Sequence, residues 1–161
     1  PDRRPEVSRC AERPPCSAPP AGAPPVTTGL WNEEELEQAA VDLAADLAPG
    51  AVVWLSGALG AGKTTFARAL LRGLGVEGEV GSPTYSLVHR HEGRDGAVYH
   101  VDCYRLASED EARDLAWDTI AQGRAVVIEW PERAGVWTPP ASRHVRLAHT
   151  ADPDRRAVEV R

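Results

Sequence analysis

A glycine-rich stretch, GALGAGKTTF at residues 57–66, carries the residue types needed to hold a phosphate group. Gly57, Gly62, Lys63 and Thr64 match the pattern G-x-x-x-x-G-K-[ST]. In this pattern the glycines let backbone N–H groups converge on phosphate oxygens at a helix N-terminus, whose dipole favours anions. Lys63 can then bridge the β- and γ-phosphates, and the Thr64 hydroxyl can bind Mg²⁺. The stretch therefore predicts a nucleotide-binding loop.

Two acidic residues are candidates for binding the metal or positioning the attacking water. Glu129 directly follows the apolar run AVVI, and a nucleotide-binding loop of this kind needs an acid at the end of a neighbouring strand. The alternative interpretation of Glu129 is an ordinary surface glutamate at the end of a strand. Asp102 interrupts the β-like run HVDCYR, where burial is costly without a partner. It could bind Mg²⁺ through water, orient the attacking water, or form a structural ion pair with Arg105, and the residue types leave these open.

Three further features allow a functional and a structural interpretation. The loop GVEGEVGSPTY ends in Ser82-Pro83-Thr84, and the Thr84 hydroxyl could close on the γ-phosphate. A plain connecting loop is equally compatible with that sequence. His100 is interpreted as a satisfied strand histidine. Trp130 follows Glu129, but it is interpreted, like the other tryptophans, as a packing residue.

The elements around the glycine loop have the order that such a loop requires. The run AVVWLS (51–56) is continuously apolar with β-branched residues, which is typical of a strand covered on both faces. Residues 64–74 place Phe66, Ala69, Leu70 and Leu74 at helical spacing, and Gly75 follows as a cap. Strand, glycine loop and helix in this order argue against a chance match to the motif.

The remaining elements predict an α/β fold. Asn32 and Glu35 form a capping box for an amphipathic helix that ends at Pro49-Gly50. TYSLVHRHE and AVYHVDCYR flank a GRDG turn as a β-hairpin, and SEDE (108–111) begins a further helix. AVVIEW (125–130) is a second buried strand, and HVRLAHT with AVEVR forms a terminal strand pair. We expect a P-loop NTPase three-layer sandwich with a mixed, mostly parallel sheet that includes the hairpin.

Length and composition indicate one compact domain with a tail. The chain has 161 residues, of which 42% are hydrophobic. Residues 1–26 hold eight of the 14 prolines and almost no large apolar side chains, so we expect a disordered tail followed by an ATPase domain over 27–161. The three cysteines form neither a disulfide framework nor a metal knuckle, and Cys103 is expected to be a packed thiol.

Charge and hydropathy narrow the choice of partners and of compartment. The net charge is −6, the pI is about 5.4, and Lys and Arg form no dense run, so direct binding to nucleic acid is not expected. No window approaches about 18 uninterrupted apolar residues, and the N-terminal sequence lacks the pattern of a signal peptide. We expect a cytoplasmic protein that has no contact with a membrane.

What the sequence lacks favours ATP over GTP. A GTPase reads guanine with an Asn-Lys-x-Asp loop, and the only asparagine is Asn32, which precedes the glycine loop.

A small metabolite kinase would need an acceptor pocket and usually an arginine-bearing lid that excludes water from phosphoryl transfer. The chain leaves little room for either, although Arg105, Arg113 and Arg133 keep that alternative open.

Four stretches together, GALGAGKTTF, SPTYSLVHR, YHVDCYRL and VIEWPER, resemble the bacterial TsaE (YjeE) family over about residues 27–161. The resemblance implies an ATPase of tRNA threonylcarbamoyladenosine biosynthesis, with ATP and Mg²⁺ as cofactors. It also implies that the chain joins the TsaB and TsaD proteins, supports turnover of their complex, and meets tRNA only through it. The alternatives are a small ATP-dependent metabolite kinase, and a nucleotide-gated assembly scaffold with little hydrolysis.

The same resemblance assigns roles to individual residues. It implies Lys63, Asp102 and Glu129 as catalytic residues, Thr64 and Glu129 at Mg²⁺, and Ser82-Pro83-Thr84 in a switch-like segment. Ala58, where the family often has aspartate, and Cys103, where leucine is common, are departures that bear on packing. The residues implied to surround the phosphates are Gly57, Leu59, Gly60, Ala61, Gly62, Lys63, Thr64 and Thr65.

Overall fold

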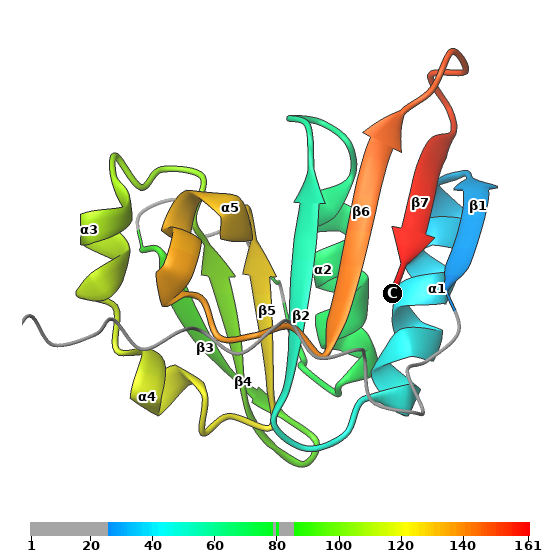
Figure 1. Ribbon diagram of the computed structural model, residues 1–161. Coiled ribbons are helices and arrows are strands. Elements are labelled where there is room, and N and C mark those ends of the chain that lie inside the picture. Colours follow the sequence, from blue (N-terminus) through cyan, green and yellow to red (C-terminus); the bar gives the residue numbers. More distant parts are fainter. Residues whose placement is uncertain (1–25, 79, 81–85) are drawn as a thin grey trace, which may run out of the picture.

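The computed structural model describes residues 26–78, 80 and 86–161. In this part of the chain a seven-stranded sheet has the order β1-β7-β6-β2-β5-β4-β3, with helices on both of its faces (Figure 1). Of the predicted tail only Val26 falls within the described residues, and Ser82-Pro83-Thr84 lies outside them. The elements are β1 (Thr27–Trp31), α1 (Glu33–Asp46), β2 (Ala51–Gly57), α2 (Lys63–Gly73), β3 (Val88–Gly93), β4 (Gly96–Asp102), α3 (Glu109–Arg113), α4 (Trp117–Ile120), β5 (Ala125–Glu129), α5 (Pro131–Ala134), the short 3₁₀ helix η1 (Gly135–Trp137), β6 (Arg143–His149) and β7 (Arg156–Val160).

The centre of the sheet is parallel, and both of its edges are antiparallel. β2 runs parallel to β5 and β6, and β5 runs parallel to β4. β3 pairs antiparallel with β4, and β7 pairs antiparallel with both β6 and β1. This arrangement confirms the predicted mixed, mostly parallel core with a hairpin. Because parallel neighbours end at the same edge, β2, β4 and β5 bring their carboxyl ends together.

Alternating side chains of the central strands build two cores. On one face Val53 and Val127 pack with Phe66 and Leu70 of α2 and with residues of α1. On the other face Ile128 and its neighbours pack with residues of α3, α4 and α5. Each fully buried Leu or Phe side chain contributes about 1.5–3 kcal/mol through removal from water. The helix α2 is thereby fixed against the sheet directly behind the glycine loop.

Local signals predicted most of these elements. The capping box of α1 is present in full, because Asn32 accepts from the Glu35 backbone N–H and Glu35 accepts from that of Asn32. α3 begins after Ser108 as expected, but the Ser108 side chain makes no capping hydrogen bond. Cys103 is a buried free thiol, as predicted. Trp137, expected to pack, is exposed instead.

Candidate nucleotide site

The glycine loop lies between β2 and α2, as predicted, and its glycines adopt backbone angles that other residues avoid. Gly57, Gly60 and Gly62 have φ values of 144°, 75° and 101°. A Cβ atom on Gly57 would lie 2.0 Å from the backbone oxygen of Leu147 in the neighbouring strand β6. A side chain at position 57 would therefore both strain the backbone and collide with β6. Gly62 is the N-cap of α2, so the loop ends at the positive end of that helix.

Lys63 is the only lysine in the sequence, and it is almost completely buried, with 4% of its surface exposed. Its ammonium donates to the carbonyl oxygens of Gly57 and Ala58, each at 2.8 Å. It also lies 3.8 Å from the centre of the Trp130 ring, a cation–π distance. Burial lowers the Lys63 pKa, and the nearby carboxylates, Glu129 first among them, oppose this shift. The cation is thus held at the loop by carbonyl groups and an aromatic ring, with no carboxylate of the described residues in direct contact.

Glu129 ends β5 and is 1% exposed, so the alternative of a surface glutamate is wrong. Its Oε2 atom accepts from the Thr64 hydroxyl at 2.9 Å, and its Oε1 atom lies 2.8 Å from Nε2 of His100. The hydroxyl and the carboxylate come from two elements that are 65 residues apart in the chain. Hard oxygen ligands of this kind are those that Mg²⁺ prefers, so this pair fits the metal that the sequence predicts.

Asp102 is the register partner of Glu129 across the parallel pair β4 and β5. Burial raises the pKa of Asp102 above its ordinary value of 3.8, and the nearby Glu129 carboxylate raises it further. The backbone N–H of Tyr104 donates to Oδ1 of Asp102 at 2.9 Å and opposes this rise. The positive charge of Arg105 lowers the Asp102 pKa slightly. Both predicted roles of Asp102, as a functional acid and as the partner of Arg105 in a structural ion pair, are therefore still open. A partly buried acid next to a buried acid is typical of a functional site.

These residues line one cavity of about 350 Å³ at the carboxyl ends of the strands. Of the residues expected around the phosphates, Gly57 and Ala61 do not line it: Gly57 contributes the carbonyl that holds Lys63, and Ala61 is buried. Thr84 lies outside the described residues. The lining residues are Leu59, Gly60, Gly62, Lys63, Thr64, Thr65, Asp102, Tyr104, Glu129 and Trp130.

Sequence reasoning missed the aromatic wall of this cavity. Trp130 has φ 56°, and it is the one non-glycine residue with positive φ in the described part of the chain. Its ring lies 5.1 Å from that of Tyr104, and the Arg133 guanidinium lies 5.1 Å from the centre of the Tyr104 ring. Strain of this kind clusters at functional sites. The adjacency of Trp130 to Glu129 was the available signal, but the left-handed turn that aims its ring at Lys63 has no local sequence signature.

The interpretation of His100 as a satisfied strand histidine is correct for only one of its ring nitrogens. Nε2 contacts Glu129, whereas Nδ1 is buried without a hydrogen-bond partner in the described structure. The contact depends on the pairing of β4 with β5, which cannot be read from the sequence around His100.

A strand, a glycine loop and a helix, with an acid at the end of the adjacent parallel strand, define the fold as that of the P-loop NTPases. The family model described as "Threonylcarbamoyl adenosine biosynthesis protein TsaE" matches residues 30–158. The chain belongs to the TsaE family. None of the helices among the described residues is long and apolar enough to cross a bilayer.

Individual relatives agree with this assignment. A Treponema pallidum protein named tRNA threonylcarbamoyladenosine biosynthesis protein TsaE is 42% identical over 110 residues, which are 68% of this chain and 81% of the relative. A Rickettsia felis protein of the same name is 38% identical over 104 residues, which are 64% of this chain and 61% of that relative. The chain thus spans less than two thirds of the Rickettsia protein. The crystal structure of Bacillus subtilis YdiB superposes with a TM-score of 0.67 at 27% identity, covering 84% of this chain and 86% of that one.

Proposed function

We propose that this chain is a Mg²⁺-dependent ATPase that supports threonylcarbamoylation of the adenosine next to the anticodon of tRNA. The observation that carries the proposal is the convergence of Lys63, the Thr64–Glu129 pair and Asp102 on one cavity at the glycine loop. Phosphoryl chemistry asks a protein mainly for positioning and for stabilisation of negative charge. A cation, an anion-binding helix end and two acids in one cavity meet those requirements.

Each residue has a distinct task in this proposal. The loop amides and Lys63 stabilise negative charge on the β- and γ-phosphates, because they are in place before charge develops. Lys63 reaches the phosphates by exchanging the carbonyls of Gly57 and Ala58 for phosphate oxygens. Thr64 and Glu129 would hold Mg²⁺, which supplies neutralising charge to the phosphates. Asp102, or a water ordered by Glu129, positions the attacking water.

The choice of nucleotide and of partners rests on other observations. The sequence offers no guanine-reading Asn-Lys-x-Asp loop, which favours ATP. Membership of the TsaE family favours action beside the TsaB and TsaD proteins in the cytoplasm. An acidic chain of net charge −6 meets a protein complex more readily than bare tRNA, so tRNA is reached through that complex.

The test is phosphate release from Mg·ATP by the full chain, with and without the TsaB and TsaD proteins of the same organism. We expect a low basal rate and strong stimulation by the partners together, with modified adenosine formed in tRNA. Label from the γ-phosphate on a metabolite in place of free phosphate would support a kinase. Modification of tRNA that persists without hydrolysis would support a nucleotide-gated scaffold.

A further inference from the structure

His100 is a buried histidine that touches the acid at the centre of the site. It lies in β4, has no exposed surface, and places Nε2 2.8 Å from Oε1 of Glu129. The second oxygen of the same carboxylate accepts from Thr64 at 2.9 Å. Both oxygens of Glu129 are therefore engaged by protein groups, one from β4 and one from α2.

The register of the sheet explains how His100 reaches Glu129. In the parallel pair of β4 and β5, His100 lies beside Val127 and Asp102 lies beside Glu129. Side chains alternate along a strand, so His100 and Asp102 share one face of the sheet, and Glu129 lies on that face too. His100 thus supports Glu129 from the side of the core, one step below the cavity that Asp102 lines.

The hydrogen bonding of His100 points to a task beyond packing. A carboxylate oxygen accepts hydrogen bonds, and in the tautomer with its hydrogen on Nε2 the His100 ring donates to Oε1 of Glu129. Nδ1 is buried with no partner among the described residues, although a polar atom without a partner costs stability. A histidine selected for the core alone would satisfy both nitrogens or be replaced by an apolar side chain. Here the one bond that is made is the bond to Glu129.

We propose that His100 is a positioning residue that fixes the Glu129 carboxylate so that Oε2 stays directed at Thr64, the pair proposed to hold Mg²⁺. This inference rests on the proposed function, because it concerns the same metal pair. Groups that hydrogen-bond a metal-binding carboxylate orient it, and removing them typically lowers metal affinity or activity by about 10- to 100-fold. His100 does not touch the phosphates in this role; it acts through Glu129.

Two variants of the full chain separate positioning from packing. In His100→Gln the side-chain amide reaches about as far as Nε2 and can donate to Glu129, whereas in His100→Asn the amide stops near the position of Nδ1 and cannot. The readout is Mn²⁺ binding to the protein with ADP, followed by electron paramagnetic resonance. We expect about 10- to 100-fold weaker Mn²⁺ binding for His100→Asn, a change of less than about threefold for His100→Gln, and unchanged ADP binding without metal. His89→Gln, on the paired strand β3, is the matched control and should leave Mn²⁺ binding unchanged.

A double variant and a spectrum complete the test. If His100 acts through Glu129, His100→Asn adds no further loss of Mn²⁺ affinity in a Glu129→Ala background; an equal loss in both backgrounds overturns the proposal. The wild-type chain should show a slowly exchanging Nε2–H resonance of His100 that shifts in Glu129→Gln. Its absence overturns the proposal even if His100→Asn does not fold. If the wild-type chain binds neither ADP nor Mn²⁺ with ADP, the proposed function fails first; if Glu129→Ala weakens Mn²⁺ binding and His100→Asn does not, only the role of His100 fails.

Discussion

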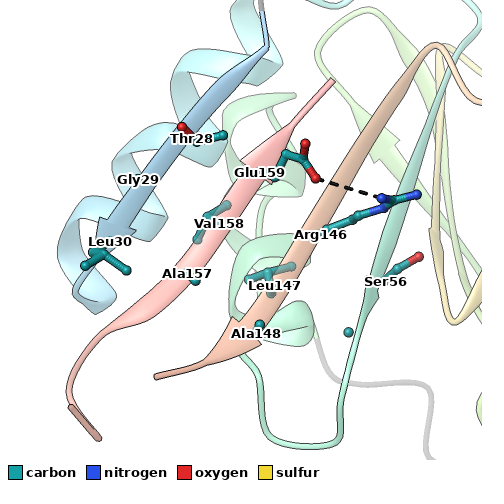
Figure 2. A pocket seen from close by; sticks show the side chains of 11 residues that line it. Thr28, Gly29, Leu30, Ser56, Arg146, Leu147, Ala148, Ala157, Val158 and Glu159 are labelled. Carbon is teal, nitrogen blue, oxygen red and sulfur yellow. Dashed lines mark ion pairs between the residues drawn. The ribbon is translucent and has the colours of Figure 1, made fainter. Parts of the chain in front are cut away.

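Two of the cavities that the described residues form differ in what lines them. The larger, about 600 Å³, lies over the antiparallel half formed by β1, β7 and β6 and the end of β2 (Figure 2). Its lining is mostly apolar or backbone, and the dashed line in Figure 2 joins its one ion pair among the described residues, Arg146 with Glu159 at 3.9 Å. The smaller, about 350 Å³, lies at the ends of the parallel strands and gathers Lys63, Asp102 and Glu129.

The topology of each half accounts for this difference. Parallel strands end together, so single residues at the ends of β4 and β5 meet each other and the helix that follows β2. Antiparallel neighbours end at opposite edges, so β1, β7 and β6 leave a face without converging ends. Cavity size alone would therefore point to the antiparallel half of the molecule, whereas the convergence of titratable groups points to the proposed site.

The largest effect should come from Lys63→Ala. Removing the one ammonium in the smaller cavity should lower ATP hydrolysis by at least about 10²–10³-fold, because Lys63 is the group proposed to stabilise the charge that develops on the phosphates. Phosphate release measured with the partner proteins present checks this. Hydrolysis that survives the substitution would show that the glycine loop does not cradle the phosphates.

Glu129→Ala should follow, with a loss of hydrolysis on the order of 10²-fold while nucleotide still binds. The loop amides remain in this variant, but Thr64 loses the carboxylate that it contacts at 2.9 Å. Equilibrium binding of a fluorescent ADP analogue, measured beside phosphate release, separates the two effects. Unchanged turnover would transfer the metal role to Asp102.

Asp102→Asn should stabilise the fold at pH 7 by a small amount while it impairs hydrolysis. The Asp102 pKa is raised above 3.8, chiefly by burial, so the folded state favours the neutral acid. This preference stabilises the fold fully at pH values below the pKa that Asp102 has in the unfolded chain. The stabilisation is lost as the pH rises through the higher pKa that Asp102 has in the folded chain. Asparagine is always neutral and can still accept from Tyr104, so the gain in Tm should shrink as pH falls from 7 towards 3.8. A gain independent of pH would refute this explanation.

Arg146→Ala, in the larger cavity, should have the smallest effect. Its ion pair with Glu159 is long and the Arg146 side chain is about half exposed, so the free energy of unfolding should change by no more than about 0.5 kcal/mol. Phosphate release should match that of the wild-type chain. A loss of hydrolysis comparable with that of Glu129→Ala would mean that the antiparallel half takes part in the chemistry.

Sequence reasoning found what depends on local signals. The run AVVWLS, the glycines and the helical spacing after Lys63 fixed β2, the loop and α2, and the run before Glu129 placed this acid at a strand end. It missed β1, because Thr27–Trp31 is mostly exposed and its ladder forms with Arg156–Val160 at the far end of the chain. No local pattern encodes a pairing at that separation.

The site was predicted less completely than the fold for a related reason. The contact of Thr64 with Glu129 follows from the order of elements, and the motif anticipates it. The contact of His100 with Glu129 depends instead on the register between two strands, and the position of the Trp130 ring depends on one left-handed backbone angle. Both are products of tertiary structure, so residue types alone could not distinguish them from packing.

The most direct test of the account is the map of backbone amide chemical-shift changes when the full, isotope-labelled chain binds Mg²⁺ with a non-hydrolysable ATP analogue. We predict that the largest changes fall on the loop at Gly60–Thr65 and on the strand ends at Asp102 and Glu129. Residues of the larger cavity such as Leu30, Val158 and Glu159 should stay near their free positions. Large changes on β1 and β7 with an unaffected loop would contradict the claim that the smaller cavity is the nucleotide site.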